Sequence, residues 1–150
     1  MGSVTAAIPD GALVVIDSVA FIYFLEQNPR YGAAASELFE RIEGGRLRAL
    51  ASALVLTEVL VTPLKQGDVA RARATSLELR RFPNLRIRPV DVPVAERAAD
   101  LRARHGLRTP DAVHAATGLQ NRADWMVAND LKLRRVASDG LQPWLFDDHV

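Results

Sequence analysis

Two short apolar runs, each followed closely by an acidic residue, constrain the fold more than any other feature of this sequence. Residues 12–16 read Ala-Leu-Val-Val-Ile, and residues 125–128 read Trp-Met-Val-Ala. A continuous apolar run of this length, rich in β-branched residues in the first case, is typical of a strand that is buried on both faces of a parallel sheet. Segments with helical patterns separate these runs from each other. The sequence therefore predicts the α/β fold class.

Turn and capping signals divide the rest of the chain into further elements. Strands are expected over residues 12–16, 47–51, 85–90, 125–128 and 144–146, and helices over residues 19–27, 31–42, 52–61, 68–82, 94–105, 109–121 and 130–137. Pro63 should break or kink the third of these helices. The order predicts one domain over residues 1–150, a three-layer α/β/α sandwich with a mainly parallel central sheet, and residues 1–11 form a loose lead-in.

The composition narrows the functional classes. The chain has no cysteine, which excludes disulfides, thiolate metal sites and a cysteine nucleophile, and which suits a reducing cytoplasm. No apolar run approaches the roughly 18 residues that a membrane-spanning helix needs. The first ten residues lack the basic and apolar regions of a secretory signal. We therefore expect a cytoplasmic protein.

Glu58 is the most unusual single residue, because it lies inside the apolar run 53–61. Burying an ionised carboxylate without a partner costs several kcal/mol, and pairing or metal binding is the usual remedy. No Lys or Arg lies within six residues of it on either side. Its partner must come from elsewhere in the fold, and one candidate is a cation that it shares with Asp17, Asp111 and Asp130.

These three aspartates occupy suggestive positions. Asp17 directly follows the first predicted strand, Asp130 follows the strand over 125–128 after one residue, and Asp111 lies in the first turn of a predicted helix. Ligands of open parallel sheets bind beyond the carboxyl ends of the strands. If the four acids converge there, a hard ion such as Mg²⁺ or Mn²⁺ would compensate their repulsion. Metal-assisted hydrolysis of a phosphodiester is the chemistry that such a site serves best.

Structural explanations compete with this interpretation. Asp17 and Asp130 could simply cap the helices that follow them, and the helix dipole alone would favour Asp111. Glu58 could reach solvent near the end of its helix. His114 shares a helix face with Asp111 and could contact the site or its substrate, but a histidine in such a place is more often a packed helix residue.

Four segments together resemble the acidic motifs of PIN-domain nucleases, and the short layout resembles the VapC-type toxins of bacterial toxin–antitoxin pairs. The segments are Val14-Val15-Ile16-Asp17-Ser18, Ser52-Ala53-Leu54-Val55-Leu56-Thr57-Glu58-Val59, Thr109-Pro110-Asp111-Ala112-Val113-His114-Ala115-Ala116-Thr117 and Val127-Ala128-Asn129-Asp130. The resemblance implies a PIN fold, an endoribonuclease that uses Mg²⁺ or Mn²⁺, RNA such as tRNA or rRNA as substrate, inhibition by a cognate antitoxin protein, and a homodimer.

The same resemblance assigns roles to particular residues. It implies that Asp17, Glu58 and Asp111 are the principal metal ligands and catalytic acids, that Asp130 is the fourth, and that Ser18 and Asn129 are polar neighbours of the site. Two positions depart from the family pattern. Ala128 stands where a hydroxyl residue is usual and Leu133 where a phenylalanine is usual, which places the role of Asp130 and the level of activity in question.

The charge distribution leaves two further questions open. Residues 71–108 carry ten arginines and four acids, which suits either a phosphate-binding face or ordinary solvated helix faces. Aromatic and leucine side chains of the first two helices would serve either a partner or the core: Phe21, Tyr23, Phe24, Leu38 and Phe39. A non-toxin RNA-processing nuclease and a non-catalytic module that binds RNA or protein are the alternative functions.

Overall fold

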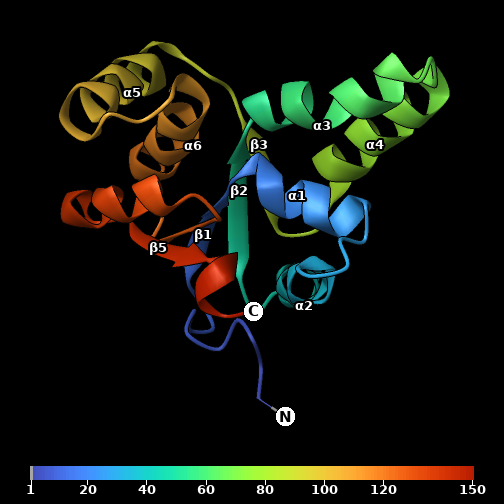
Figure 1. Ribbon diagram of the computed structural model, residues 1–150, viewed down its shortest axis with the longest axis horizontal. Coiled ribbons are helices and arrows are strands. Elements are labelled where there is room, and N and C mark those ends of the chain that lie inside the picture. The colour runs from blue at the N-terminus through green and yellow to red at the C-terminus, as the bar shows by residue number, and fades with distance from the viewer. Residues whose placement is uncertain (1) are drawn as a thin grey trace.

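The computed structural model describes residues 2–150, and its centre is a five-stranded sheet whose strands all run parallel (Figure 1). The strands are β1 (Leu13–Ile16), β2 (Arg48–Ser52), β3 (Leu85–Arg88), β4 (Trp125–Ala128) and β5 (Gln142–Leu145), in the order β3-β2-β1-β4-β5. Chain order reverses between β1 and β4, so the crossovers on the two sides of β1 run in opposite directions along the sheet. Parallel sheets place their ligand sites at such a switch point.

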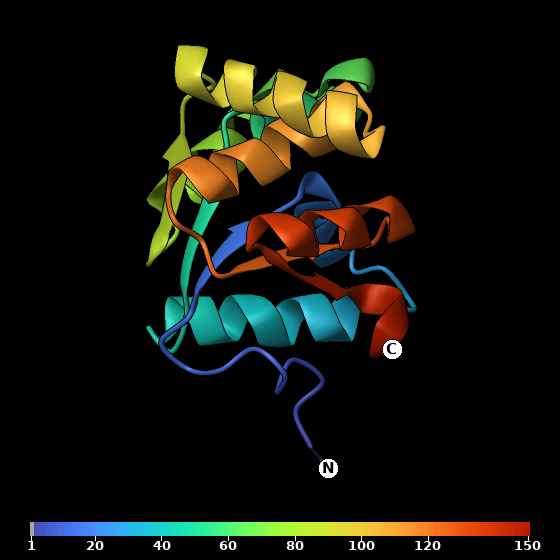
Figure 2. The same cartoon turned by 90° about the vertical axis from the view of Figure 1, so that its left-hand side faces the viewer.

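Helices cover both faces of the sheet, as the sequence predicts. The elements are α1 (Ser18–Leu25), α2 (Gly32–Glu43), α3 (Leu54–Lys65), α4 (Val69–Arg81), α5 (Val92–His105), α6 (Thr109–Gln120) and the short 3₁₀ helices η1 (Leu131–Asp139) and η2 (Phe146–Asp148). Figure 1 shows α1 and α2 on one side of the sheet and α5 and α6 on the other, and Figure 2 shows α5 and α6 side by side. The three-layer α/β/α prediction is confirmed.

The central strand β1 shows why the apolar runs are uninterrupted. Val14 and Ile16 face the core under α1 and α2, whereas Val15 faces the core under α5 and α6. All three side chains are fully buried. A strand covered on both faces has no solvent side to mark with polar residues, so its sequence cannot alternate.

Pro63, which was expected to break or kink the helix over residues 52–61, does not break it. The helix α3 continues to Lys65 with Pro63 inside it. The proline lies in the last turn, where it removes only its own N–H bond, and its carbonyl accepts a hydrogen bond from the Asp68 backbone. Its ring is buried, so packing compensates for the missing bond.

The expected lead-in over residues 1–11 contains no helix or strand in the part that the structure describes, but tertiary contacts hold it. Thr5 and Ile8 have no exposed surface. The Glu37 carboxylate accepts hydrogen bonds from the Val4 and Thr5 backbones, and the buried Arg41 guanidinium donates to carbonyl groups of the same segment. The segment is therefore fixed to α2.

The aromatic side chains of α1 and α2 belong mostly to the core. Phe21, Leu38 and Phe39 are at most 2% exposed, and Tyr23 and Phe24 pack against them while partly buried. The structure therefore favours a core role for these five residues over a role in binding a partner. No helix among residues 2–150 is long and apolar enough to cross a membrane.

Candidate active site

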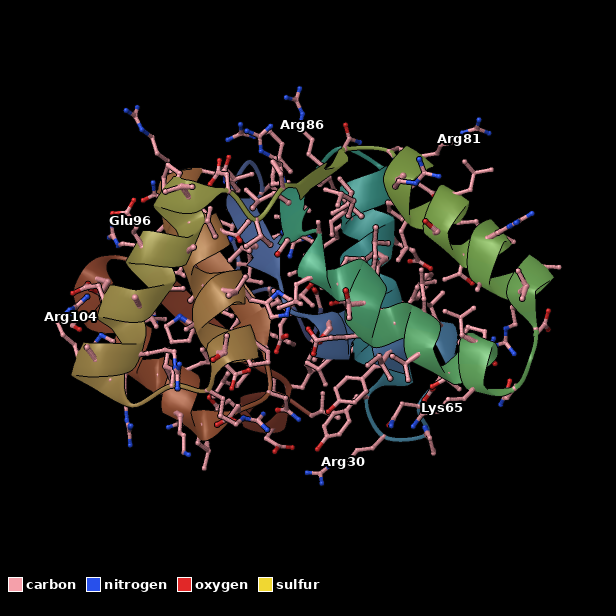
Figure 3. All side chains as sticks on the ribbon, turned by 90° about the horizontal axis from the view of Figure 1, so that it is seen from above. Arg30, Lys65, Arg81, Arg86, Glu96 and Arg104 are labelled. Carbon is pink, nitrogen blue, oxygen red and sulfur yellow. The ribbon has the colours of Figure 1, made fainter. Side chains whose placement is uncertain are left out.

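The four acids that the sequence singles out line one cleft at the carboxyl end of the sheet. Asp17 follows β1, Asp130 follows β4, Glu58 lies on α3 and Asp111 lies in the first turn of α6. The cleft has a volume of about 700 Å³. Figure 3 looks down on α3 and α6, whose side chains meet above the sheet. The strand ends and the two helices thus bring together residues that are far apart in the sequence.

Asp17 is not a helix cap. It occupies the position before α1, but its side chain accepts no capping hydrogen bond from that helix. Instead its Oδ1 accepts a bond of 3.2 Å from the Ser18 hydroxyl and lies 3.4 Å from His114 Nε2. Burial raises the pKa of Asp17 above its ordinary value against the opposing effect of His114, and the charges of Asp111 and Glu58 add to the rise. This carboxylate lacks full compensation for its charge.

Glu58 finds the partner that its apolar surroundings require. His114 Nε2 lies 2.7 Å from Glu58 Oε1, and the Glu58 side chain keeps 32% of its surface exposed. The hydrogen bond from His114 lowers the pKa of Glu58 despite its partial burial. Burial alone would lower the pKa of His114, but the bond to Glu58 and the charge of Asp17 outweigh it and raise that pKa.

Arg108 serves the other pair of acids. Its Nε lies 3.4 Å from Asp111 Oδ2, and its Nη2 lies 4.0 Å from Asp130 Oδ2. Burial raises the pKa of Asp111, with Arg108 opposing the rise and the charge of Asp130 adding to it. Asp130 also accepts a hydrogen bond from the Lys132 backbone, so it caps the helix η1, as the capping explanation expects.

The two polar neighbours differ in how they relate to the cleft. Ser18 is buried against Asp17, as described above. Asn129 lines the cleft, but its amide nitrogen donates to the Tyr23 hydroxyl and its oxygen accepts from the Asp147 backbone. Asn129 therefore ties the end of β4 to α1 and to η2.

Two residues of the site were not assigned from the sequence. His114 is buried, as expected of a packed helix residue, yet it also contacts two of the four acids. Its position three residues after Asp111 was the available signal. Arg108 was counted only within the arginine-rich stretch, although it precedes Asp111 by three residues and so reaches the same helix end.

The donor set suits a hard divalent cation. Carboxylate oxygens are the ligands that Mg²⁺ and Mn²⁺ prefer, and the buried, raised-pKa carboxyls Asp17 and Asp111 are those that a cation would stabilise. Within residues 2–150 the side chains as they stand do not bring three acidic or imidazole groups to one coordination point. His114 and Arg108 hold Glu58 and Asp111 in separate pairs, so these two basic groups compensate part of the acids' charge in this arrangement.

Comparison with known proteins gives one family and a set of similar folds. The family model for the PIN domain matches residues 14–139, and no curated protein matches the chain. VapBC2 from Rickettsia felis, solved with a promoter DNA fragment, is 14% identical with a TM-score of 0.69, over 89% of this chain and 98% of that one.

Two further solved structures are similar at the level of the fold. DNA-bound VapBC from Salmonella typhimurium is 17% identical with a TM-score of 0.67, over 90% of this chain and 98% of that one. VapC20 from Mycobacterium tuberculosis is described as a toxin that cleaves the sarcin-ricin loop. It is 16% identical with a TM-score of 0.61, over 77% of this chain and 87% of that one.

Proposed function

The chain belongs to the PIN-domain family, and from this premise we propose that it is an endoribonuclease that hydrolyses RNA phosphodiester bonds with Mg²⁺ or Mn²⁺. The observation that carries the proposal is the convergence of four carboxylates on one cleft at the carboxyl end of a parallel sheet. Structural use alone does not account for this convergence, because Asp17 caps no helix and is nevertheless buried.

Asp17, Glu58 and Asp111 would be the principal ligands of the ion, with Asp130 as the fourth acid. A bound divalent ion supplies a hydroxide nucleophile at neutral pH and neutralises the charge that develops on the phosphate. His114 orients the Glu58 carboxylate through the 2.7 Å hydrogen bond. Arg108 is 71% exposed at the mouth of the cleft and is placed to bind a phosphate oxygen of the substrate. The products would be a 5′-phosphate and a 3′-hydroxyl.

We further propose that the protein is the toxin of a toxin–antitoxin pair, as the similarity to VapC-containing complexes suggests. Its partner would be a cognate antitoxin protein, and a basic segment of that protein would suit the acidic cleft electrostatically. A cytoplasmic homodimer is the form that this role implies. Growth arrest on expression, relieved by co-expression of a small neighbouring gene product, would support the toxin role, and absence of relief would count against it.

The nuclease proposal is tested with purified protein and two RNA samples, total tRNA and a generic single-stranded RNA. Cleavage is expected with Mg²⁺ or Mn²⁺ and not with EDTA. Asp17→Asn and Glu58→Gln should each reduce the rate by at least about 10²-fold, because each removes a ligand of the ion. Glu96→Gln is the matched control. Glu96 is exposed on α5 and does not line the cleft, so this variant should cleave RNA like the wild type.

Circular dichroism spectra that match the wild type would show that the inactive variants are folded. Full activity in either cleft variant would overturn the assignment of that residue. Absence of cleavage of every RNA, together with absence of divalent-ion binding by calorimetry, would favour a module that binds RNA or protein without catalysis.

A further inference from the structure

A second groove, separate from the acidic cleft, lies over β2 and the edge strand β3. Its volume is about 620 Å³, and three arginines line it: Arg48, Arg86 and Arg88. All three side chains are exposed. Figure 3 shows the labelled Arg86 side chain pointing outward, away from the body of the molecule. Nothing in the acidic site uses these residues.

The three arginines share one face of the sheet. Side chains two residues apart along a strand point to the same face, so Arg48 lies on the face of Leu50, which packs under α5 and α6. Arg86 is opposite Leu50 in the parallel register and therefore lies on that face too. Arg88 follows two residues later. The groove is thus a strip of sheet surface beyond the cover of α6.

The strand register places the arginines in a row that runs toward the carboxyl end of the sheet. Arg48 pairs with Leu13 at the start of β1, whereas Arg88 pairs with Ser52 at the carboxyl end of β2. The carboxyl end of the sheet is where Asp17 follows β1. Two strand spacings, roughly 10 Å, separate β3 from β1 at the level of the backbone. A chain bound along the row would arrive at the same end of the sheet as the cleft.

The charge of this row is not neutralised within the protein. Among residues 2–150, no acidic side chain lines the groove, and no carboxylate forms an ion pair with Arg48, Arg86 or Arg88. Some other arginines of the molecule are paired, as Arg104 is with Asp100 and Asp139, and what distinguishes this row is that three unpaired arginines line one groove. Exposed, unpaired arginines in a concave strip attract a polyanion and can hold phosphates in bidentate fashion.

We propose that Arg48, Arg86 and Arg88 form a track that binds the phosphate backbone of single-stranded RNA and leads it toward the acidic cleft. The choice of RNA rests on the proposed ribonuclease function. Arg86 and Arg88 repeat at about 6.6 Å, the two-residue repeat of a strand, which suits successive phosphates of an extended nucleic-acid chain. The Asn121 amide nitrogen is bound to the Thr117 carbonyl, so its oxygen remains as an acceptor for a ribose 2′-hydroxyl.

The track is tested by direct binding of a fluorescent single-stranded RNA of about twelve nucleotides, a length within the range of known single-strand sites. Fluorescence anisotropy in EDTA over a series of salt concentrations measures affinity without cleavage. The double variant Arg86→Glu/Arg88→Glu should weaken binding by at least about tenfold at low salt. The slope of log K against log salt should fall by roughly 1.4, for two lost contacts at about 0.7 each.

The matched control is Arg73→Glu/Arg80→Glu. It makes the same change in net charge with two exposed arginines of α4, on the other side of the sheet, and should bind RNA like the wild type. The conservative variant Arg86→Lys/Arg88→Lys keeps the charge and should retain most of the salt slope. Equal weakening in the track and control variants would overturn the proposal, because bulk charge would then explain the binding.

Two other polyanions, single-stranded DNA and polyglutamate, test whether the groove prefers RNA. Single-stranded DNA of the same sequence should bind more weakly than RNA, and polyglutamate of the same charge should bind more weakly than either. Equal binding of DNA would overturn the choice of RNA. Equal binding of polyglutamate, lost in the same variants, would assign the groove to an acidic protein and overturn the proposal.

The outcomes separate this proposal from the proposed function. If the wild type cleaves no RNA but binds it through Arg86 and Arg88, the nuclease assignment fails and the track stands. If the wild type cleaves RNA and the track variants bind it unchanged, the nuclease stands and the track fails. In an active enzyme, the track variants should raise KM for long RNA and leave kcat unchanged.

Discussion

Glu58 keeps a charge within an apolar helix because a basic group from another helix lies against it. His114 Nε2 is 2.7 Å from Glu58 Oε1 and 3.4 Å from Asp17 Oδ1. The imidazole has no exposed surface, so the pair is only partly screened by water. Breaking one partner of such a pair leaves the other uncompensated, and the coupling between the two should therefore be measurable.

A double-mutant cycle tests this contact. His114→Asn and Glu58→Gln, alone and together, should show an interaction energy of about 0.5–3 kcal/mol in urea unfolding, because the two side chains bond to each other. The control cycle pairs His114→Asn with Glu26→Gln. Glu26 is exposed directly after α1 and forms no bond to His114, so this cycle should be additive within about 0.5 kcal/mol. Additivity in both cycles would contradict the geometry described here.

The acids of the site were more predictable than the basic residues beside them. Asp17 and Asp130 stand next to strand ends, and Glu58 is conspicuous in an apolar run, so position along the chain marks them as candidates. The roles of His114 and Arg108 depend on how α6 is rotated and docked against α3 and the sheet. Sequence spacing shows that each shares a helix face with Asp111, but not which acids that face meets.

The docking of α6 depends on one small residue. A Cβ atom at Gly118 would lie 2.5 Å from Val15 Cγ1, far inside a normal contact. Val15 is fully buried in the central strand, so neither partner can move freely. The glycine therefore allows α6 to lie close to β1, and it helps to set where Asp111 and His114 meet the cleft.

Gly118→Ala should destabilise the protein although alanine favours helices. The helical preference contributes about 1 kcal/mol in favour of alanine, while overpacking of a tight core typically costs about 1–3 kcal/mol. We expect a net loss of stability in urea unfolding, with a lower midpoint and an unchanged m-value. Gln120→Ala, at an exposed position of the same helix, should leave the midpoint nearly unchanged. A midpoint for Gly118→Ala at or above that of the wild type would show that α6 can shift at little cost.

Glu37 connects the N-terminal segment to α2 and gives that connection a pH dependence. Its carboxylate accepts bonds from the backbones of Val4 and Thr5 and from the hydroxyls of Ser3 and Thr5. Burial would raise the pKa of Glu37, but these bonds, those of Thr5 above all, outweigh it and lower the pKa. A lowered pKa in the folded state means that the stabilisation is present above the ordinary glutamate value, about 4.3, and is lost as pH falls through the folded pKa.

Glu37→Gln should therefore destabilise the protein at pH 7 by about 1–2 kcal/mol, the usual scale for a charged hydrogen-bond acceptor that is partly exposed. The difference from the wild type should shrink as pH falls below about 4.3, because the wild-type carboxyl becomes protonated too. Urea unfolding at a series of pH values measures this difference in stability. Glu40→Gln, exposed on the same helix, should show no such trend. A difference that is constant from pH 7 to pH 3 would exclude the carboxylate as its source.

Most elements follow from the sequence, and the exceptions have a common cause. The strands over Ala12–Ile16 and Trp125–Ala128 were predicted almost to the residue, because apolar runs bounded by polar residues mark them. The continuation of α3 past Pro63 and the contacts of the N-terminal segment do not follow from the sequence, because they depend on a buried ring and on the Glu37 and Arg41 bonds. Local signals do not report such contacts.

At the scale of the whole molecule, the fold gathers negative charge where it is unfavourable for stability. Asp17 and Asp111 are 7% and 6% exposed, and each lies near other acids. His114 and Arg108 compensate only part of this charge. Sites that are arranged for binding often reduce the stability of the unliganded protein, and a ligand of opposite charge then restores it. The carboxylate cleft should behave in this way toward divalent ions.

Mn²⁺ should therefore raise the melting temperature, and EDTA should reverse the rise. At a hundredfold excess over Kd, ligand binding to the folded state contributes about 2.7 kcal/mol, which corresponds to roughly 5–10 °C for a chain of this size. Asp17→Asn should abolish the shift, because it removes a proposed ligand of the ion. It should also melt no lower than the metal-free wild type, because it removes a buried charge that His114 only partly compensates. Glu96→Gln should keep the full shift. A full Mn²⁺ shift in Asp17→Asn would place the ion elsewhere, and a metal-free melting temperature well below that of the wild type would make Asp17 a structural residue instead.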